Sequence, residues 1–328
     1  MNNAPWLLTL LSVTPQARLH LDYVESFNED VAVFDVRRGR AGFEATAGDA
    51  LTAKLDWNLD AMILHETWLN VGGDKAALRV GWQKVPIEGA WLESSNRLAF
   101  LERPMLTSVL GTDRQWTAML HGGAQGAAYA ISVVPSGELA GRIGGTRERQ
   151  EGFISLGYAT RDISAALKTG SGAQIGDTEV LTDGTFRGGV DHSSVFGALR
   201  IDLRVGLAFT PDPAQGPRTT TGATALVGRW ILTGEPHRLG KGVEAARPFA
   251  PEQRDMGALE ANLRVEAASV RNGSAGQLSG GLVWTPGVGT RALFNVGHAF
   301  SDVEDMGETF ATIRIQVEGK ALQGVSMD

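Results

Sequence analysis

Six charged side chains are gathered between Gly81 and Arg103, in a stretch that also carries apolar residues. An arginine keeps its charge in any environment, and its planar fork of N–H donors fits a carboxylate or a phosphate. Only six of the thirty basic residues of the whole chain are lysines, a bias that arginine-rich codon usage also explains. The basic side chains of the run are therefore suited to binding an anion. The charged residues of the run are Lys84, Glu88, Glu93, Arg97, Glu102 and Arg103.

A short strand should precede this run, and a long loop should contain it. Leu78, Val80 and Trp82 alternate with more polar positions until Pro86 interrupts the pattern. Most hairpin loops have about two to five residues, so a loop of roughly twenty indicates function or disorder. The apolar residues within it, such as Trp91, indicate a packed segment. We therefore expect a loop folded into the mouth of a barrel.

No catalytic or metal-binding arrangement is recognisable. The six histidines are scattered without a His-x-x-x-His or Glu-x-x-His spacing, and cysteine is absent. His65 and Glu66 are adjacent, which points them to opposite faces of a strand. The glycine-rich run at 141–145 precedes no clear helix, so it is not a phosphate-cradling loop. We predict no enzyme activity, no metal site and no cofactor.

Length and charge exclude other classes. A chain of 328 residues with 42 glycines and recurrent turn signals fits a single large all-β domain. The formal charge of -7 argues against nucleic acid as a partner, because a nucleic-acid binder needs a basic face. No run reaches the roughly 20 apolar residues of a transmembrane helix.

Alternating segments define the fold class. In Leu51–Asp60, leucine, alanine and tryptophan occupy one face, and threonine, lysine, asparagine and aspartate the other. Ten residues at ~3.3 Å each, tilted near 45°, cross a bilayer core. A soluble sandwich alternates in the same way, but the strand lengths and the Trp and Phe residues near strand ends favour an all-β, transmembrane, antiparallel β-barrel. The pattern recurs at 18–24, 200–209, 259–267, 292–300 and 311–317.

The two ends of the chain depart from this pattern. Residues 1–17 contain a nine-residue apolar run without a basic leader or a clean cleavage site, and we interpret them as a degenerate signal, a plug or a lead-in to the first strand. Residues 18–317 form the expected barrel. Residues 318–328 form a polar C-terminal extension.

Several motifs resemble the phosphate-selective porin O and P family of outer-membrane channels. The Ser-Ser…Phe-x-Glu-Arg and Leu-Thr-Gly-Glu-Pro segments carry most of the likeness, which runs loosely from Arg18 to Val317 and is weakest between Arg142 and Val227. The motifs are Val36-Arg-Arg-Gly-Arg-Ala-Gly-Phe43, Leu78-Arg-Val-Gly-Trp-Gln-Lys-Val-Pro86, Glu93-Ser-Ser-Asn-Arg-Leu-Ala-Phe-Leu-Glu-Arg103, Trp230-Ile-Leu-Thr-Gly-Glu-Pro236 and Gly281-Leu-Val-Trp-Thr-Pro286.

The resemblance implies a barrel of about 16 strands, a homotrimer, and a third loop folded inward to narrow the pore. At ~20 residues per strand and turn, the chain length agrees with that strand number. The resemblance also implies an anion-binding constriction at the residues in or beside this loop. These are Lys84, Arg97, Arg103 and Arg114.

Strand parity adds six arginines on polar faces, which we predict to line the pore. Some of them have acidic neighbours, as Asp202 beside Arg200, and these could instead be neutralised by a lumen carboxylate. Glu102 next to Arg103 is expected to anchor the loop to the wall. The six predicted pore-lining residues are Arg38, Arg40, Arg200, Arg204, Arg264 and Arg314.

The predicted function is passive diffusion of anions such as phosphate or polyphosphate through the bacterial outer membrane, with inorganic anions and outer-membrane lipid as partners. A weakly selective general diffusion porin and a plugged barrel with a structural envelope role remain open. A membrane barrel places one requirement on these strands. The apolar rows must face outward, and the arginines must face an enclosed interior.

Overall fold

The computed structural model describes residues 11–320, except 29–30, 111–112, 162, 182–183, 211–218, 238, 240–248, 251–252, 254, 271–272 and 303–305. The first nine strands are β1 (Leu11–Ser26), β2 (Val31–Ala47), β3 (Leu51–Asn58), β4 (Ile63–Gly73), β5 (Ala76–Lys84), β6 (Arg114–Ala124), β7 (Ala127–Val134), β8 (Glu138–Arg147) and β9 (Gln150–Ala159). The others are β10 (Ile163–Lys168), β11 (Gln174–Leu181), β12 (Thr185–Phe196), β13 (Leu199–Thr210), β14 (Thr219–Ile231), β15 (Ala258–Val270), β16 (Gly273–Gly287), β17 (Thr290–Ser301) and β18 (Met306–Lys320). Two short helices, α1 (Gly89–Leu92) and α2 (Met105–Val109), lie between β5 and β6.

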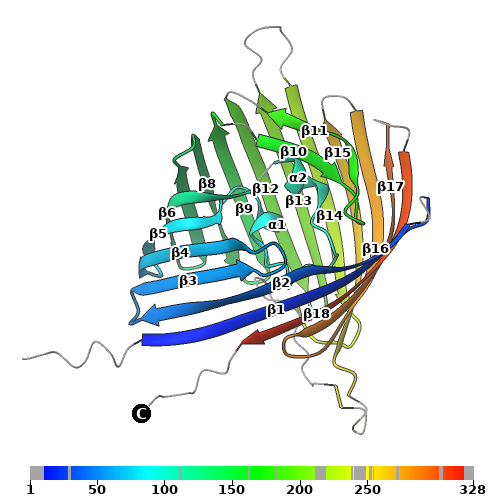
Figure 1. Cartoon of the computed structure of the whole chain (residues 1–328), viewed down its shortest axis with the longest axis horizontal. Helices are drawn as coiled ribbons and strands as arrows, with labels where there is room; N and C mark the ends of the chain where they lie inside the picture. The colour runs from blue at the N-terminus through cyan, green and yellow to red at the C-terminus, as the bar shows by residue number, and fades with distance from the viewer. Residues whose placement is uncertain are drawn as a thin grey trace, which may run out of the picture.

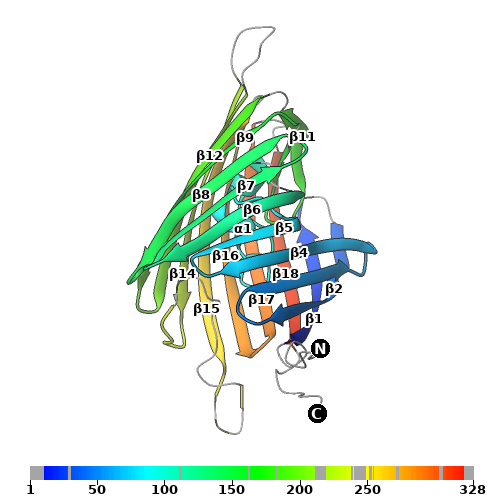
Figure 2. The same cartoon turned by 90° about the vertical axis from the view of Figure 1, so that its left-hand side faces the viewer.

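Sixteen of the strands in the described part of the chain close into one antiparallel barrel (Figures 1 and 2). Each barrel strand pairs with its neighbours in sequence, and β1 pairs with β18 to complete the ring. Strands β10 and β11 pair only with each other, so β9 pairs directly with β12. The predicted fold class is confirmed.

Side-chain alternation explains the barrel. On β15, Leu263 and Val265 are 55% and 48% exposed, while Arg264 and Glu266, which alternate with them, are 2% and 3% exposed. The same division holds along β13, where Leu203 is exposed and the flanking charged residues are buried. The apolar rows therefore face outward and the charged rows face the interior, as the sequence required.

The connection between β5 and β6 is the third at its end of the barrel. Successive strands run antiparallel, so the β1–β2, β3–β4 and β5–β6 connections emerge at one end, which we call the loop end. The opposite end, where β1 begins and β18 finishes, is the terminal end. The described residues of 85–113, which we call the inward loop, turn into the barrel, and both α1 and α2 lie within the ring of strands (Figure 1). This confirms the inward-folded third loop.

The described barrel extends beyond both limits of the expected range 18–317, and β1 includes part of the segment for which a lead-in to the first strand was one interpretation. Strand β1 begins at Leu11, inside the segment 1–17 that the sequence analysis kept apart, and it pairs with β2 from that residue. Strand β18 ends at Lys320, inside the predicted extension 318–328. Residues 11–17 include no charged side chain, so their alternation is a weaker signal for a strand than that of residues 18–24. Residues 1–10 and 321–328 lie outside the described residues.

The described residues contain no helix long and apolar enough to cross a membrane.

We expect an arginine in the outward apolar rows to destabilise the barrel according to its depth. Leu263→Arg, near the middle of β15, should cost about 2–4 kcal/mol of unfolding free energy, because a charge at the bilayer midplane loses its hydration. Ser269→Arg, near the loop end of the same strand, should cost about 0–1 kcal/mol. Urea unfolding in lipid vesicles measures both, and equal costs would mean that this face is not in a bilayer.

Candidate functional site

Wall side chains hold the inward loop through its backbone. The amide of Leu101 donates to Asn295 Oδ1 at 3.1 Å, and its carbonyl accepts from Arg314 Nη1 at 3.1 Å. The amide of Met105 donates to Glu266 Oε1 at 2.8 Å. Because a buried backbone group without a partner is costly, these bonds fix the loop against β15, β17 and β18. Further bonds of this kind join Arg264 to Glu102 O, Arg291 to Asn96 O, Arg187 to Leu110 O and Gly89 N to Asp191.

Four of the arginines predicted to line the pore do not border the main cavity, and three of them, Arg204, Arg264 and Arg314, contact the inward loop. All four face the interior, as strand parity predicted, but each is bonded to a carboxylate. Arg314 donates to Asp22 at 2.7 and 2.6 Å. The other three pairs are Arg200–Asp202 at 2.7 Å, Arg204–Glu93 at 3.2 Å and Arg264–Glu266 at 2.8 Å. The alternation of residues along a strand predicts the face on which a side chain lies. It does not predict which part of that face a loop covers.

Glu102 contacts a different partner from the one expected. Its carboxylate accepts from Arg37 of β2 at 2.6 Å, while the side chain of Arg103 turns back into the loop. Arg103 donates to the carbonyls of Ala90 at 2.9 Å and Glu93 at 2.8 Å. Glu102 thus links the loop to β2, and Arg103 links two parts of the loop to each other.

Glu88 organises the start of the loop. Its carboxylate accepts from the amides of Ala90 at 2.5 Å and Trp91 at 2.6 Å, and from the hydroxyl of Thr107 at 2.9 Å. The first two bonds cap α1, and the third joins α1 to α2. Burial raises the pKa of the Glu88 carboxyl, against the opposing effect of these hydrogen bonds and of Arg204.

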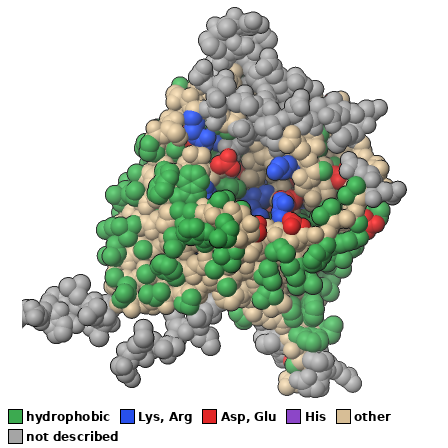
Figure 3. Space-filling view, viewed as in Figure 1, with side chains coloured by type: hydrophobic (Ala, Val, Ile, Leu, Met, Phe, Trp, Pro, Cys, Tyr) green, Lys and Arg blue, Asp and Glu red, His purple; other side chains and the backbone are tan. Residues whose placement is uncertain are grey.

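A cavity of about 1010 Å³ remains between the loop and the wall formed by β1 to β7. Among the described residues, nine cations and four carboxylates border it, although the whole chain carries a charge of -7. Figure 3 shows Lys, Arg, Asp and Glu side chains inside a hollow on one face, with hydrophobic side chains over the surrounding wall. The cations are Arg18, Arg38, Arg40, Lys54, Arg79, Lys84, Arg97, Arg103 and Arg114, and the carboxylates are Asp49, Glu66, Asp74 and Glu318.

All four residues of the predicted constriction, Lys84, Arg97, Arg103 and Arg114, border this cavity. Lys84, Arg103 and Arg114 surround the ring of Trp91, at 5.3, 5.4 and 5.4 Å from its centroid. Lys84 Nζ also donates to the carbonyls of Trp91 and Glu93, at the end of α1. The structure therefore assigns Lys84 and Arg103 a second task, which is to hold the loop.

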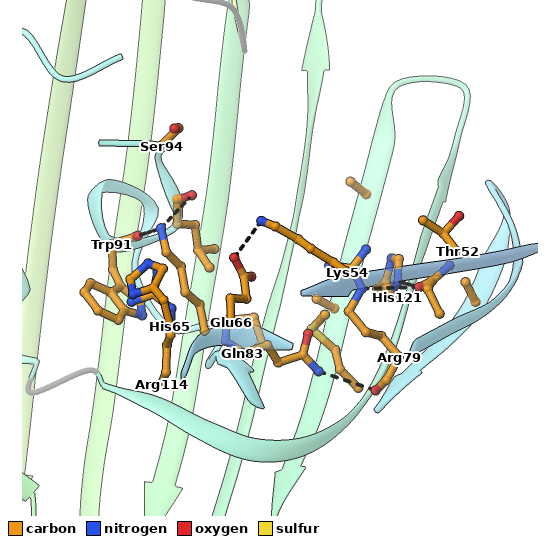
Figure 4. A pocket seen from close by; sticks show the side chains of 18 of the residues that line it. Thr52, Lys54, His65, Glu66, Arg79, Gln83, Trp91, Ser94, Arg114 and His121 are labelled. Atoms are coloured by element: carbon orange, nitrogen blue, oxygen red, sulfur yellow. Dashed lines mark hydrogen bonds and ion pairs between the residues drawn. The ribbon is translucent and has the colours of Figure 1, made fainter. Parts of the chain in front are cut away.

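Five side-chain nitrogen atoms beside the cavity have no hydrogen-bond partner within the described part of the chain. They are buried atoms of the cluster around Arg114, and unpaired buried donors are costly unless a ligand or water binds them. Figure 4 shows His65, Trp91 and Arg114 side by side. Four of the atoms are N–H donors, and the role of the fifth, His65 Nε2, depends on the ring tautomer. The donors are Arg38 Nη1, Arg40 Nε, Trp91 Nε1 and Arg114 Nε.

His65 and Trp91 were missed as site residues. The sequence analysis placed His65 and Glu66 on opposite faces of a strand, yet both border the cavity. The cause is a β-bulge, since Asp56 pairs with Glu66 while Trp57 pairs with Leu64. An extra residue in one strand re-aims a side chain and is not visible in alternation. The sequence indicates only a packing role for Trp91, because its neighbours give no sign of a nearby cavity.

Glu66 lies among these cations. Its carboxylate accepts from Lys54 Nζ at 2.8 Å and from Trp68 Nε1 at 3.3 Å. It is also within electrostatic reach of Arg79, Lys84 and Arg114. Figure 4 shows it between the Trp91 group and a second group that contains Arg79 and His121.

The fold is shared with outer-membrane channels. OmpT of Vibrio cholerae in its trimer form and the anion-selective porin of Comamonas acidovorans each match with a TM-score of 0.66 and 11% identity, over 94% of this chain and 99% of theirs. The outer-membrane channel DcaP of Acinetobacter baumannii matches with a TM-score of 0.60 and 10% identity, over 94% of this chain and 97% of its own. No family model and no curated protein matches the sequence. At these identities the likeness establishes the barrel fold alone.

Removing the Glu88 carboxylate should loosen the inward loop without unfolding the barrel. Glu88→Ala leaves the amides of Ala90 and Trp91 without acceptors, at about 1–3 kcal/mol for each group. We expect their hydrogen exchange to accelerate roughly ten- to hundredfold. Glu151→Ala is the control, because that carboxylate accepts only a 3.4 Å bond from Thr146 at the surface. Unchanged exchange in Glu88→Ala would show that other contacts hold α1.

Proposed function

We propose that the protein is a passive diffusion channel of the bacterial outer membrane that prefers anions. The observation that carries this proposal is the group of unpartnered N–H donors on Arg38, Arg40 and Arg114 beside the cavity. The outward apolar rows support insertion into a bilayer. An anion in the cavity would exchange part of its water shell for these donors, as in other selective pores.

Oxygen-rich anions such as phosphate or polyphosphate fit the site best. Donors from β2, β6 and the inward loop border the cavity, and an anion with several acceptor oxygens can bind more than one at once. One charge pair at 4 Å is worth roughly 4 kcal/mol at an effective dielectric near 20. A succession of such partners lets an ion move between sites without being trapped.

We propose a homotrimer because part of strand β2 forms a free edge of the barrel wall. Strand β3 pairs with β2 only from Arg40 to Ala47, so residues 31–39 of β2 have no strand on that side in the described chain. Val33, Phe34 and Val36 of this free edge are 49%, 69% and 43% exposed. An apolar edge of this kind is suited to covering by another copy of the chain.

Two other functions make different predictions. The four carboxylates of the cavity favour a weakly selective diffusion pore, whose conductance would not saturate with phosphate. The loops that fill the other side of the lumen favour a closed structural barrel, which would pass neither ions nor small sugars. Single-channel recording in chloride and phosphate gradients distinguishes all three.

Removal of the two β2 arginines should reduce anion preference. We expect Arg38→Ala/Arg40→Ala to lower the anion-to-cation permeability ratio by roughly tenfold, which corresponds to about 1.4 kcal/mol of lost attraction. The reversal potential of planar bilayers in a KCl gradient measures the ratio. Arg147→Ala is the matched control, since Arg147 is exposed on β8 and does not border the cavity. An unchanged potential in the double variant would remove both arginines from the ion path.

Glu66→Gln should have the opposite effect. The carboxylate opposes anions among the cations, and its neutralisation should raise the permeability ratio by about threefold to tenfold. Asp74→Asn makes the same charge change nearer the terminal end of the cavity and should do less. Equal effects would show that only the total charge of the cavity matters.

A further inference from the structure

A second loop crosses the barrel interior at the loop end. We call β10, β11 and the turn 169–173 between them the mouth hairpin. It leaves the wall after β9 and returns to it at β12, and it pairs with no barrel strand. Figure 1 shows β10 and β11 lying across this end of the barrel, close to α2.

The turn of the mouth hairpin reaches the far wall. The amide of Gly170 donates to Gln277 Oε1 of β16 at 2.6 Å, and the hydroxyl of Ser171 donates to Glu308 Oε1 of β18 at 2.7 Å. A Cβ at position 170 would lie 2.5 Å from the ring of Phe310 and 2.9 Å from Gln277 Nε2. Only glycine can therefore make this contact.

The underside of the hairpin is apolar and packs on the inward loop. Leu167 and Ile175 are 3% exposed and form one cluster with four apolar side chains of residues 105–110. Small side chains of β14, β15 and β16 leave room for this cluster on the wall. The remaining members are Met105, Leu106, Val109, Leu110, Ala223, Ala268 and Ala275.

Only non-covalent contacts among the described residues attach the mouth hairpin to the wall and to the inward loop. The hydrogen bonds of Gly170 and Ser171 and the apolar cluster beneath Leu167 and Ile175 are non-covalent, and the hairpin pairs with no barrel strand. The barrel can therefore stay closed while the hairpin leaves the wall. This differs from the inward loop, which many wall residues bind directly.

We propose that the mouth hairpin sets the size limit of the channel. When it is docked, it and α2 close the lumen beside β13 to β16, and solutes are confined to the cavity beside β1 to β7. When it undocks, the part of the lumen that the hairpin itself fills joins the cavity and widens the aqueous path, while α2 stays bound to the wall. The inference rests on the proposed function only in needing an open channel.

Gly170→Phe tests this inference, because the new side chain cannot fit against Phe310. Liposome swelling with neutral sugars of increasing size separates size from charge selectivity. We expect the swelling rate with a trisaccharide to rise by about twofold or more, since the open cross-section grows. Ala173→Phe is the matched control, because Ala173 is exposed in the same turn. An unchanged size limit in a folded Gly170→Phe barrel would overturn the inference.

A thiol pair tests the docked state separately. The chain has no cysteine, so Ser171→Cys/Glu308→Cys introduces the only two thiols. A short bifunctional thiol reagent should join them in the otherwise native barrel, and joining them should hold the sugar limit at its lower value. Addition of Gly170→Phe should abolish the cross-link. Cross-linking that persists with Gly170→Phe would contradict the inference, whereas a wild-type barrel that passes no solute would contradict the proposed channel function and leave the cross-linking result intact.

Discussion

A loop buried inside a barrel must find partners for its backbone groups, and the interior of this protein is arranged around that need. Arginines of the wall supply the donors for the loop carbonyls, and carboxylates and amide oxygens supply the acceptors for its N–H groups. Arg187, Arg264 and Arg314 also have carboxylate partners, which are Glu138, Glu266 and Asp22. A buried ion pair contributes little net stability by itself. Here the pairs keep charged donors in position to bind the loop.

The barrel interior is consequently divided into two chemical regions. Beside β13 to β18, Arg200, Arg264 and Arg314 are paired with carboxylates, and the inward loop and the mouth hairpin pack over this part of the wall. Beside β1 to β7, the loop leaves a cavity whose arginines retain donors without partners in the described chain. The same residue type therefore serves two purposes, and the difference between them is the position of the loop. In the proposed channel, ions would be selected on one side of the lumen, and the loop that narrows it would be supported from the other.

The sequence predicted the barrel well and the site only in part, for physical reasons. Alternation at 200–209 and 259–267 fixes which side chains face inward, because the strand period is two. It does not reveal that Arg264 lies under a loop while Arg40 borders a cavity. That difference depends on contacts between segments about 160 residues apart, such as Arg264 with Glu102. The bulge that turns His65 inward depends on register with β3, which no local pattern in β4 contains.

The net charge of the chain is a poor guide to what an ion meets inside. The acidic excess of the whole sequence is spread over outer connections and over carboxylates bonded to wall arginines, such as Asp202 and Glu266. Salt screens exposed charges beyond roughly 8 Å at physiological ionic strength, so distant carboxylates act weakly on the cavity. Within it, nine described cations surround a path with four carboxylates. Local arrangement, set by the fold of one loop, thus gives an acidic protein a cationic interior.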